Sequence, residues 1–424
     1  MHHTCTCHSL DRARLAQVLD TWAAGDPMLA QLPARFAERP HLIAPVALFV
    51  PEADLATIRA VVAAVERLAQ TTAWQKAALG TAPATARHAT AARGVLMGYD
   101  FHLTERGPQL IEINTNAGGA MINAMIRAAQ RACCPELAAK IAAETEQPPP
   151  TAALCAMFQT EWRRCRGNAP LTTIAIVDDD PGEQYLYPEF LLFCALLTEA
   201  GYRVAIADPT ALTCADGRLW LRSDAGARVA IDLVYNRLTD FALKAPAHAA
   251  VRDAYLGDAA VVTPHPRAHA LLADKRRLVT LSDDAALQAL GVDGETRALL
   301  LAHVPTTVLV TPENAATLWA ERRAFFFKPV AGYGSKAAYR GDKLTRRVWE
   351  TVILPGTYVA QAYAAPAVRP VPEAETGGAT KPFKFDIRAY AYDGEVLLFA
   401  ARLYAGQTTN FRTLGGGFAP VFAV

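Results

Sequence analysis

The chain has 424 residues, about three times the ~150 residues of one typical domain, which excludes a single small domain. Its 42 lysines and arginines against 41 aspartates and glutamates leave a net charge of +1, so no general attraction to a nucleic-acid backbone or an anionic membrane is expected. A content of 52% hydrophobic and 20% charged residues excludes an intrinsically disordered chain.

The number of cysteines and the lengths of the apolar runs indicate in which cellular compartment the protein is expected. Eight cysteines are too sparse for a disulfide scaffold in a chain of this length, and no apolar N-terminal stretch follows a basic start, so a cytoplasmic protein is expected. The longest uncharged run, Val352 to Val368, is interrupted by two prolines and a glycine, whereas a membrane span needs ~20 predominantly apolar residues. No transmembrane helix is therefore expected.

The first eight residues contain several potential metal ligands, namely His2, His3, Cys5, Cys7 and His8. A metal site could be built from them, but no second ligand cluster with fitting spacing follows. A frayed terminus is therefore the favoured interpretation.

Residues 10–80 are predicted to be helical. Apolar side chains recur there at three- and four-residue steps from Leu55 to Leu68, which gives a helix one apolar face. After Arg93 the period changes to two, with a strand at 95–103, a turn, and a second strand that begins at Leu110. The sequence therefore predicts a β-hairpin that leads into Asn114.

Three successive prolines, at positions 148–150, predict a domain boundary. Beyond residue 170, a strand at 171–177, a helix at 190–200 and a strand at 203–207 follow one another, which implies a parallel sheet with a right-handed crossover. Residues 231–237 and 259–263 are expected to be later strands of this sheet. A helical segment and then dense strand signals from Ala324 follow, so we expect three parts, at residues 1–146, 170–265 and 266–424.

Lys328 is predicted to leave a strand and enter a loop that contains Gly332, Gly334 and Ser335. Such a loop lets backbone N–H groups approach phosphate oxygens, while the lysine supplies a positive charge. It lacks the G-x-x-x-x-G-K-[ST] pattern, so it is not a Walker loop. Taken alone, a glycine-rich loop after a strand is more often a hairpin turn than a nucleotide site.

Three potential oxygen ligands lie near the ends of the predicted hairpin. Glu112 and Asn114 are two residues apart and so face the same side of a strand, where Asp100 on the partner strand can meet them. Oxygen ligands of this kind suit Mg²⁺. The alternative, a solvated polar strand face, is weakened because Glu112 lies in an apolar stretch, where a lone carboxylate is costly.

A third group of polar residues alternates along the segment 384–390. The alternation places Lys384, Asp386 and Arg388 on one face, and the next strand adds Arg402. Exposed charged strand faces are common, but this one is followed by Asn410 and three glycines. The combination suits an anionic group that is being transferred.

Together these motifs resemble the ATP-grasp superfamily. The matching segments are Lys-Pro-Val-x-Gly-x-Gly-Ser-Lys at 328–336, the strand at 358–363, Lys-x-Asp-Ile-Arg-x-Tyr at 384–390, Arg402, Asn410, and Asp100 with Glu112-Ile-Asn114. The metal strands normally come last in this superfamily but come first here, so the chain resembles a circularly permuted ATP-grasp protein, similar to the glutathionylspermidine synthases. The resemblance implies an α/β (α+β) fold class, with a Rossmann-like α/β domain before the nucleotide-binding part.

The resemblance also implies roles for individual residues. Two lysines, a phosphate-covering loop, an adenine-binding hinge and two strand residues would bind ATP: these are Lys275, Lys328, Gly332, Gly334, Ser335, Lys336, Gln361, Ala362, Tyr363, Lys384 and Asp386. The Mg²⁺ ligands, for which Mn²⁺ is an alternative ion, would be Asp100, Glu112 and Asn114. The group around the transferred phosphoryl would be Arg388, Arg402 and Asn410. Residues for the acceptor substrate would be Asn236 and Arg237.

An ATP-dependent carboxylate–amine ligase is the activity that the resemblance implies. A small-molecule carboxylate would be phosphorylated to an acyl phosphate, and a small-molecule amine would then displace the phosphate. The alternatives are a phosphotransferase on the same fold and a non-catalytic nucleotide-binding regulator. Loss of metal or lysine positions would mark a regulator, but all these positions are present.

Overall fold

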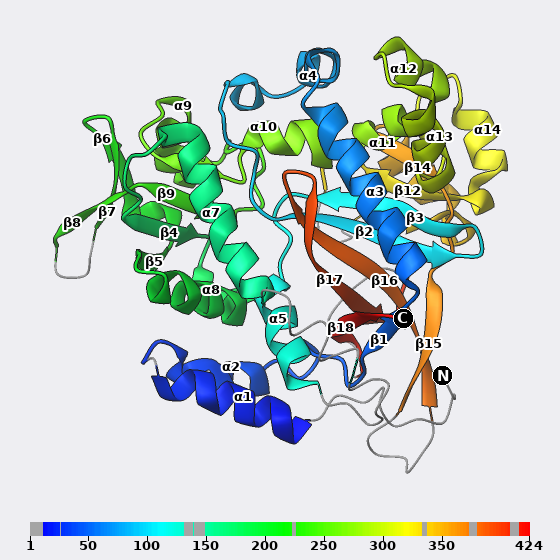
Figure 1. The fold of residues 1–424 in the computed structure, drawn as a ribbon. Coiled ribbons are helices and arrows are strands. Elements are labelled where there is room, and N and C mark those ends of the chain that lie inside the picture. The colour runs from blue at the N-terminus through cyan, green and yellow to red at the C-terminus, as the bar shows by residue number, and fades with distance from the viewer. Residues whose placement is uncertain are drawn as a thin grey trace.

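The computed structural model describes residues 12–25, 27–130, 139, 149–222, 226–332, 337–372, 380–407 and 415–424, and Figure 1 shows their arrangement. Their strands form four sheets with helices packed around them, so the predicted mixed α/β class is confirmed. No helix within these ranges is both long and apolar enough to cross a membrane.

The largest sheet joins segments from both ends of the chain. Its strands are β1 (Leu48–Val50), β2 (Met97–Thr104), β3 (Gly107–Asn114), β15 (Ala367–Pro372), β16 (Thr380–Tyr392), β17 (Glu395–Tyr404) and β18 (Gly417–Ala423). They lie in the order β1-β18-β17-β16-β2-β3, and β15 pairs with the first part of β16. The predicted hairpin is present as β2 and β3, and β2 pairs with the second part of β16.

Strand β1 lies inside the region that the sequence predicts to be helical, so that prediction is wrong at this point. Its three residues pair in parallel with β18 at the far end of the chain. A strand of three residues is too short to show a two-residue period in the sequence. Pairing with β18 therefore specifies this strand.

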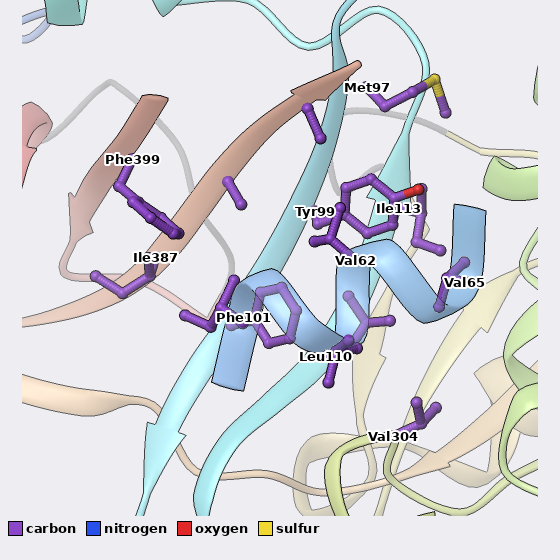
Figure 2. Packing of buried hydrophobic residues seen from close by; sticks show 14 of the residues in the cluster. Val62, Val65, Met97, Tyr99, Phe101, Leu110, Ile113, Val304, Ile387 and Phe399 are labelled. Atoms are coloured by element: carbon purple, nitrogen blue, oxygen red, sulfur yellow. The ribbon is translucent and has the colours of Figure 1, made fainter. Parts of the chain in front are cut away.

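Both faces of the largest sheet are covered by helices. Helix α3 (Glu52–Ala69) lies across β2 and β3, and Figure 2 shows Val62 and Val65 of α3 close to Tyr99 and Ile113. Each such fully buried side chain contributes ~1.5–3 kcal/mol. Helix α5 (Ala120–Ala129) packs on the opposite face, against β17 and β18.

The predicted parallel sheet is present in the middle of the chain. It has the order β10-β9-β4-β5, with β4 (Thr173–Val177), β5 (Arg203–Ala207), β9 (Leu233–Asn236) and β10 (Val261–Thr263). Helix α8 (Tyr187–Glu199) connects β4 to β5, and α7 (Pro150–Arg166) and α9 (Ala249–Leu256) also pack on this region. The sheet therefore presents the carboxyl ends of β4 and β9 side by side.

The sequence predicts one strand at 231–237, whereas the structure divides this segment. Ile231 ends β8 (Arg228–Ile231), which belongs to a three-stranded antiparallel sheet with β6 (Leu212–Ala215) and β7 (Arg218–Arg222). Asp232 separates the two strands, and its carboxylate accepts backbone hydrogen bonds from Thr172 and Thr173. An aspartate that bonds the backbone in this way interrupts a strand.

A fourth sheet has the order β11-β14-β12-β13. Its strands are β11 (Thr307–Leu309), β12 (Phe325–Pro329), β13 (Tyr339–Arg340) and β14 (Tyr358–Ala362), and all its pairs are antiparallel. The short helices α11 (Arg276–Leu281), α12 (Asp284–Ala289), α13 (Gly294–His303) and α14 (Ala315–Ala320) lie around this sheet (Figure 1). Lys328 of β12 and Gln361 of β14 are thereby placed on adjacent strands.

The start of α5 connects the largest sheet to the parallel sheet. Glu189 of α8 is fully buried, and its carboxylate accepts hydrogen bonds from the backbone N–H groups of Gly119, Met121 and Ile122 at 3.1, 3.2 and 3.0 Å. A carboxylate in this position satisfies free N–H groups of the helix and interacts favourably with its dipole. Gly119 itself has φ 102°.

We predict that Gly119→Ala destabilises the protein. A Cβ at this position would lie 2.2 Å from the Phe418 ring, and the positive φ adds backbone strain. The expected loss is ~2–4 kcal/mol of unfolding free energy, measured by urea denaturation. Gly294→Ala is the matched control, because its Cβ meets nothing within 4 Å and its φ is not positive. Equal stability of the two variants would contradict the prediction.

Candidate active site

A cleft of about 640 Å³ lies where the fourth sheet, the largest sheet and the parallel sheet meet. Basic residues are concentrated on its walls, and they are Arg237, Lys275, Lys328, Arg340, Lys384, Arg388 and Arg402. Two acidic residues of the described chain also line it, Glu112 and Asp178. The excess of cations suits an anionic ligand.

Lys328 contacts two neutral acceptors. Its Nζ donates to the carbonyl oxygen of Ile111 at 2.6 Å and to Oε1 of Gln361 at 2.8 Å. No carboxylate of the described residues lies at ion-pair distance from this ammonium group. Burial lowers the pKa of Lys328 to about 8, although Glu112 acts to raise it, so the charge is desolvated and its counter-charges lie beyond ion-pair distance.

Lys275 and Glu112 form an ion pair on the same wall. Their Nζ and Oε1 atoms are 2.9 Å apart, and Nζ also donates to the carbonyl oxygen of Gly332 at 2.9 Å. Burial acts to raise the pKa of Glu112, but the ammonium groups of Lys275 and Lys328 hold it below its usual value. Glu112 is therefore ionised, as a metal ligand must be.

Asp100 and Asp386 hold two arginines behind the cleft. Arg388 lies opposite Asp100 on β16 and β2, and its Nε and Nη2 contact the two carboxylate oxygens at 2.7 and 2.8 Å. Arg402 donates to Asp100 at 2.7 Å and to Asp386 at 2.7 and 2.9 Å. This buried network fixes both guanidinium groups where they border the cleft.

The three predicted Mg²⁺ ligands are close together, but they do not all face the cleft. Glu112 and Asn114 line it, whereas Asp100 is 0% exposed and accepts hydrogen bonds from Arg388, Arg402 and the side-chain amide of Asn114. Within the described residues, no group of three His, Cys, Asp or Glu side chains is arranged to hold a metal ion. The cleft therefore offers two oxygen donors, which fits an ion bound jointly by protein, water and substrate phosphates.

The predicted hinge also lies on the cleft wall. Gln361, Ala362 and Tyr363 line it, and the guanidinium of Arg340 lies 4.7 Å from the centre of the Tyr363 ring. Lys384 lines the cleft too and donates to the carbonyl oxygen of Gly406 at 2.9 Å. Gly334, Ser335, Lys336, Asn410 and the His/Cys cluster at the N-terminus lie outside the described residues.

The two predicted acceptor-substrate residues have different surroundings. Arg237 lines the cleft, but the Asn236 side chain donates to the carbonyl oxygen of Pro264 and accepts from the backbone N–H of Leu238. Asn236 is absent from the cleft wall and instead connects β9 to the segment after β10. Only Arg237 is thus placed to contact a ligand.

Several cleft residues were not found from the sequence. His269 stacks on Phe241 with ring centres 4.1 Å apart, and burial lowers the pKa of His269 to about 4, so it is neutral. His102 contacts the carbonyl oxygen of Ala364 and the Tyr404 hydroxyl. These contacts join segments far apart in the chain, so no local pattern indicates them.

The comparisons with known proteins support the fold. No protein-family model and no curated protein matches the sequence. A glutathione synthetase-like effector from Globodera pallida shares the fold with a TM-score of 0.56 over 100% of both chains, at 11% identity. The chain therefore shares its fold with a glutathione synthetase-like protein. At 11% identity, this likeness shows the fold alone.

Two further solved structures are less similar. A putative gamma-glutamylcysteine synthetase from Methylobacillus flagellatus has a TM-score of 0.43 at 11% identity, with 87% of this chain and 85% of that chain covered. The ATP-grasp ligase PsnB, complexed with a minimal precursor, has a TM-score of 0.32 at 12% identity, with 60% and 90% covered. Neither adds to the conclusion about the fold.

We predict that Asp178→Asn stabilises the protein at alkaline pH. Burial raises the pKa of Asp178 to about 7, so the folded state retains a proton that the unfolded chain loses near pH 4. Stability contributed by this group is therefore lost as the pH rises from about 4 to about 7. Removing the ionisable group should add ~2 kcal/mol to the unfolding free energy at pH 8, and less at pH 5.

Urea denaturation at both pH values measures this effect. Asp180→Asn is the control, since Asp180 is exposed and only two residues away. An Asp178→Asn variant that is less stable than the wild type at pH 8 would contradict the prediction.

Proposed function

We propose that the protein is an ATP-dependent ligase that joins a small-molecule carboxylate to a small-molecule amine. The observation that carries the proposal is Lys328, a half-buried ammonium group without a carboxylate of the described residues at ion-pair distance, on a cleft wall shared with Lys275, Arg388 and Arg402. Seven basic residues against two acidic ones on the cleft wall favour a polyanion such as the triphosphate of ATP. The fold shared with a glutathione synthetase-like protein is consistent with this activity.

The order of the strands supports a circularly permuted ATP-grasp arrangement. The hairpin β2–β3, which carries Glu112 and Asn114, precedes the other site elements in the chain, yet pairs with β16 near the C-terminus. We assign the parallel sheet within residues 170–265 to the preceding Rossmann-like domain. Residues 1–146 and 266–424 would together form the nucleotide-binding part.

At the nucleotide end, Lys275 and Lys328 would bind the phosphates, assisted by the loop from Gly332 to Lys336. The hinge from Gln361 to Tyr363 would hold the adenine, and Lys384 would lie beside it. Glu112 and Asn114 would hold Mg²⁺ or Mn²⁺. The ion would neutralise phosphate charge, and Asp100 would act indirectly by holding the arginines.

At the reacting end, an oxygen of the substrate carboxylate would attack the γ-phosphorus of ATP, and the bond from that phosphorus to the bridging oxygen of ADP would break. The amine would then attack the acyl carbon, lose a proton and displace inorganic phosphate. Arg388 and Arg402, which Asp100 and Asp386 hold at the cleft wall, would stabilise the charge on the transferred group. Positioning and charge stabilisation supply most of the catalysis in such reactions.

Lys328→Met is predicted to weaken ATP binding at least ~10-fold, the effect of losing one charge-assisted contact. The substitution removes a half-buried charge that has no carboxylate of the described residues at ion-pair distance, so the fold should be retained. Fluorescence titration with an ATP analogue measures the affinity. Lys76→Met, on an exposed face of α4 (Thr72–Gly80), is the control and should bind normally. Normal ATP affinity in the Lys328→Met variant would show that Lys328 does not contact ATP.

The reaction is tested by screening pairs of small carboxylates and amines for release of ADP and phosphate. We expect release that requires both members of one pair. Arg402→Lys should then lower kcat by ~100-fold or more with ATP affinity little changed, because a lysine cannot reproduce the paired contacts to two carboxylates. Phosphoryl transfer to a hydroxyl or phosphate acceptor, or ATP binding without turnover of any pair, would overturn the ligase proposal.

A further inference from the structure

Two residues of opposite charge follow directly after neighbouring strands of the parallel sheet. Val177, the last residue of β4, is in register with Asn236, the last residue of β9, so Asp178 and Arg237 are adjacent at the carboxyl ends. The backbone N–H of Arg237 donates to the carbonyl oxygen of Val177 at 2.8 Å. Both side chains line the cleft. Ligands of open parallel sheets bind at this edge.

The guanidinium of Arg237 has no anionic partner among the described residues. It donates to the carbonyl oxygens of Ala117 and Asn116 at 3.5 and 3.3 Å and to the Tyr235 hydroxyl at 3.2 Å. These three acceptors are neutral, the contacts are long, and the buried Nε has no partner in the described chain. Arg237 is only 6% exposed, so its charge is desolvated, and the carboxyl groups of Asp178 and Glu189 attract it only from beyond ion-pair distance.

The absence of a side chain at Gly118 provides the space that the guanidinium of Arg237 occupies. Gly118 lies against it, and a Cβ there would come within 3.0 Å of Nη2 and 2.3 Å of the Leu186 side chain. The rings of Tyr235 and Phe190 lie 5.3 and 5.8 Å from the guanidinium carbon. Neutral atoms thus hold the guanidinium in place and leave its charge for a ligand.

Asp178 is likewise unpaired. Its Oδ1 accepts a hydrogen bond from the backbone N–H of Asp179 at 3.0 Å, and no cation of the described residues lies at ion-pair distance. Asp178 is only 9% exposed, and burial raises its pKa. The carboxyl group of Asp178 and the guanidinium of Arg237 therefore lie next to each other on the cleft wall without forming an ion pair.

We propose that this end of the cleft binds the zwitterionic group of an α-amino acid, or of a peptide end, with the ligand carboxylate on Arg237 and its ammonium group near Asp178. The inference rests on the proposed function in one respect, because the group would belong to one of the two substrates of the ligase. A planar guanidinium suits a carboxylate, and a carboxylate at the neighbouring strand end suits an ammonium. Leu186 and Phe241 offer apolar surface to the rest of such a molecule.

Binding without nucleotide tests the site separately from catalysis. The probes are the common L-α-amino acids and their dipeptides with glycine, each compared with its C-terminal carboxamide and its N-acetyl derivative, by saturation-transfer NMR and calorimetry. We expect at least one free zwitterion to bind, and each modification to weaken it at least ~10-fold, the scale for losing one charged contact. Absence of binding by every free zwitterion, or equal binding of a carboxamide, would overturn the proposal.

Variants then locate the contact. Arg237→Met should lose the discrimination between acid and carboxamide, and Asp178→Asn should lose that between the free and acetylated amine. Arg203→Met, at the exposed amino end of β5, is the control and should keep both. If the methionine variant does not fold, Arg237→Lys replaces it, because this variant keeps a cation at the position. It should retain part of the discrimination between acid and carboxamide. Full discrimination in a folded Arg237→Met variant, shown by normal Mg-ATP binding, would exclude Arg237.

The two proposals fail in different ways. If zwitterions bind but no pair of substrates releases ADP, the ligase proposal fails and the zwitterion site stands. If a substrate pair without any zwitterionic group supports full turnover, the zwitterion site fails and the ligase proposal stands.

Discussion

A buried network of two carboxylates and two guanidinium groups holds the largest sheet together where β2, β16 and β17 meet. Asp100, Asp386, Arg388 and Arg402 come from these three strands and pair across them. Removing one member would leave buried charges unpaired, which typically costs ~3–5 kcal/mol, so the network is strongly coupled to the strand pairing. The site arginines are therefore positioned by the same contacts that join the N-terminal hairpin to the C-terminal strands.

Other ionisable groups in the cleft differ from this network, because no group of opposite charge among the described residues lies at ion-pair distance from them. Lys328, Arg237 and Asp178 each lose hydration, and the opposite charges near them lie beyond ion-pair distance. Such an arrangement lowers stability in the empty protein and favours a ligand that supplies the missing charges. The cleft thus combines a rigid, internally paired region behind the arginines with unpaired groups that face the ligand.

The segment from Asn114 to Gly119 connects these regions. Asn114 bonds to Asp100 at one end, and Gly119 starts α5 under the carboxylate of Glu189 at the other. Between them, the carbonyl oxygen of Gly118 accepts from the Tyr390 hydroxyl at 2.7 Å, and the carbonyl oxygens of Asn116 and Ala117 contact Arg237. One short loop therefore positions both the candidate metal ligand and the candidate substrate arginine.

Much of the local structure could be predicted from the sequence. The two-residue period of β2 and β3, the strand–helix–strand order of the parallel sheet, and the polar face of Lys384, Asp386 and Arg388 are all patterns of neighbouring residues. The concentration of lysine and arginine on one cleft also follows from these patterns once the ATP-grasp resemblance is recognised. The division of 231–237 could not be predicted, because the carboxylate of Asp232 bonds to residues about 60 positions away.

The sequence by itself determined which residue types carry charge and which strand face each occupies, because alternation along a strand depends only on the local backbone. Only the tertiary structure decided that Asp100 pairs with two arginines rather than facing the cleft, that β1 pairs with β18, and that Asp178 and Arg237 lie side by side without pairing. The physical reason is that an ion pair or a strand pair depends on which distant segments come into contact. Burial then determines whether a charged group remains hydrated or requires a partner of opposite charge.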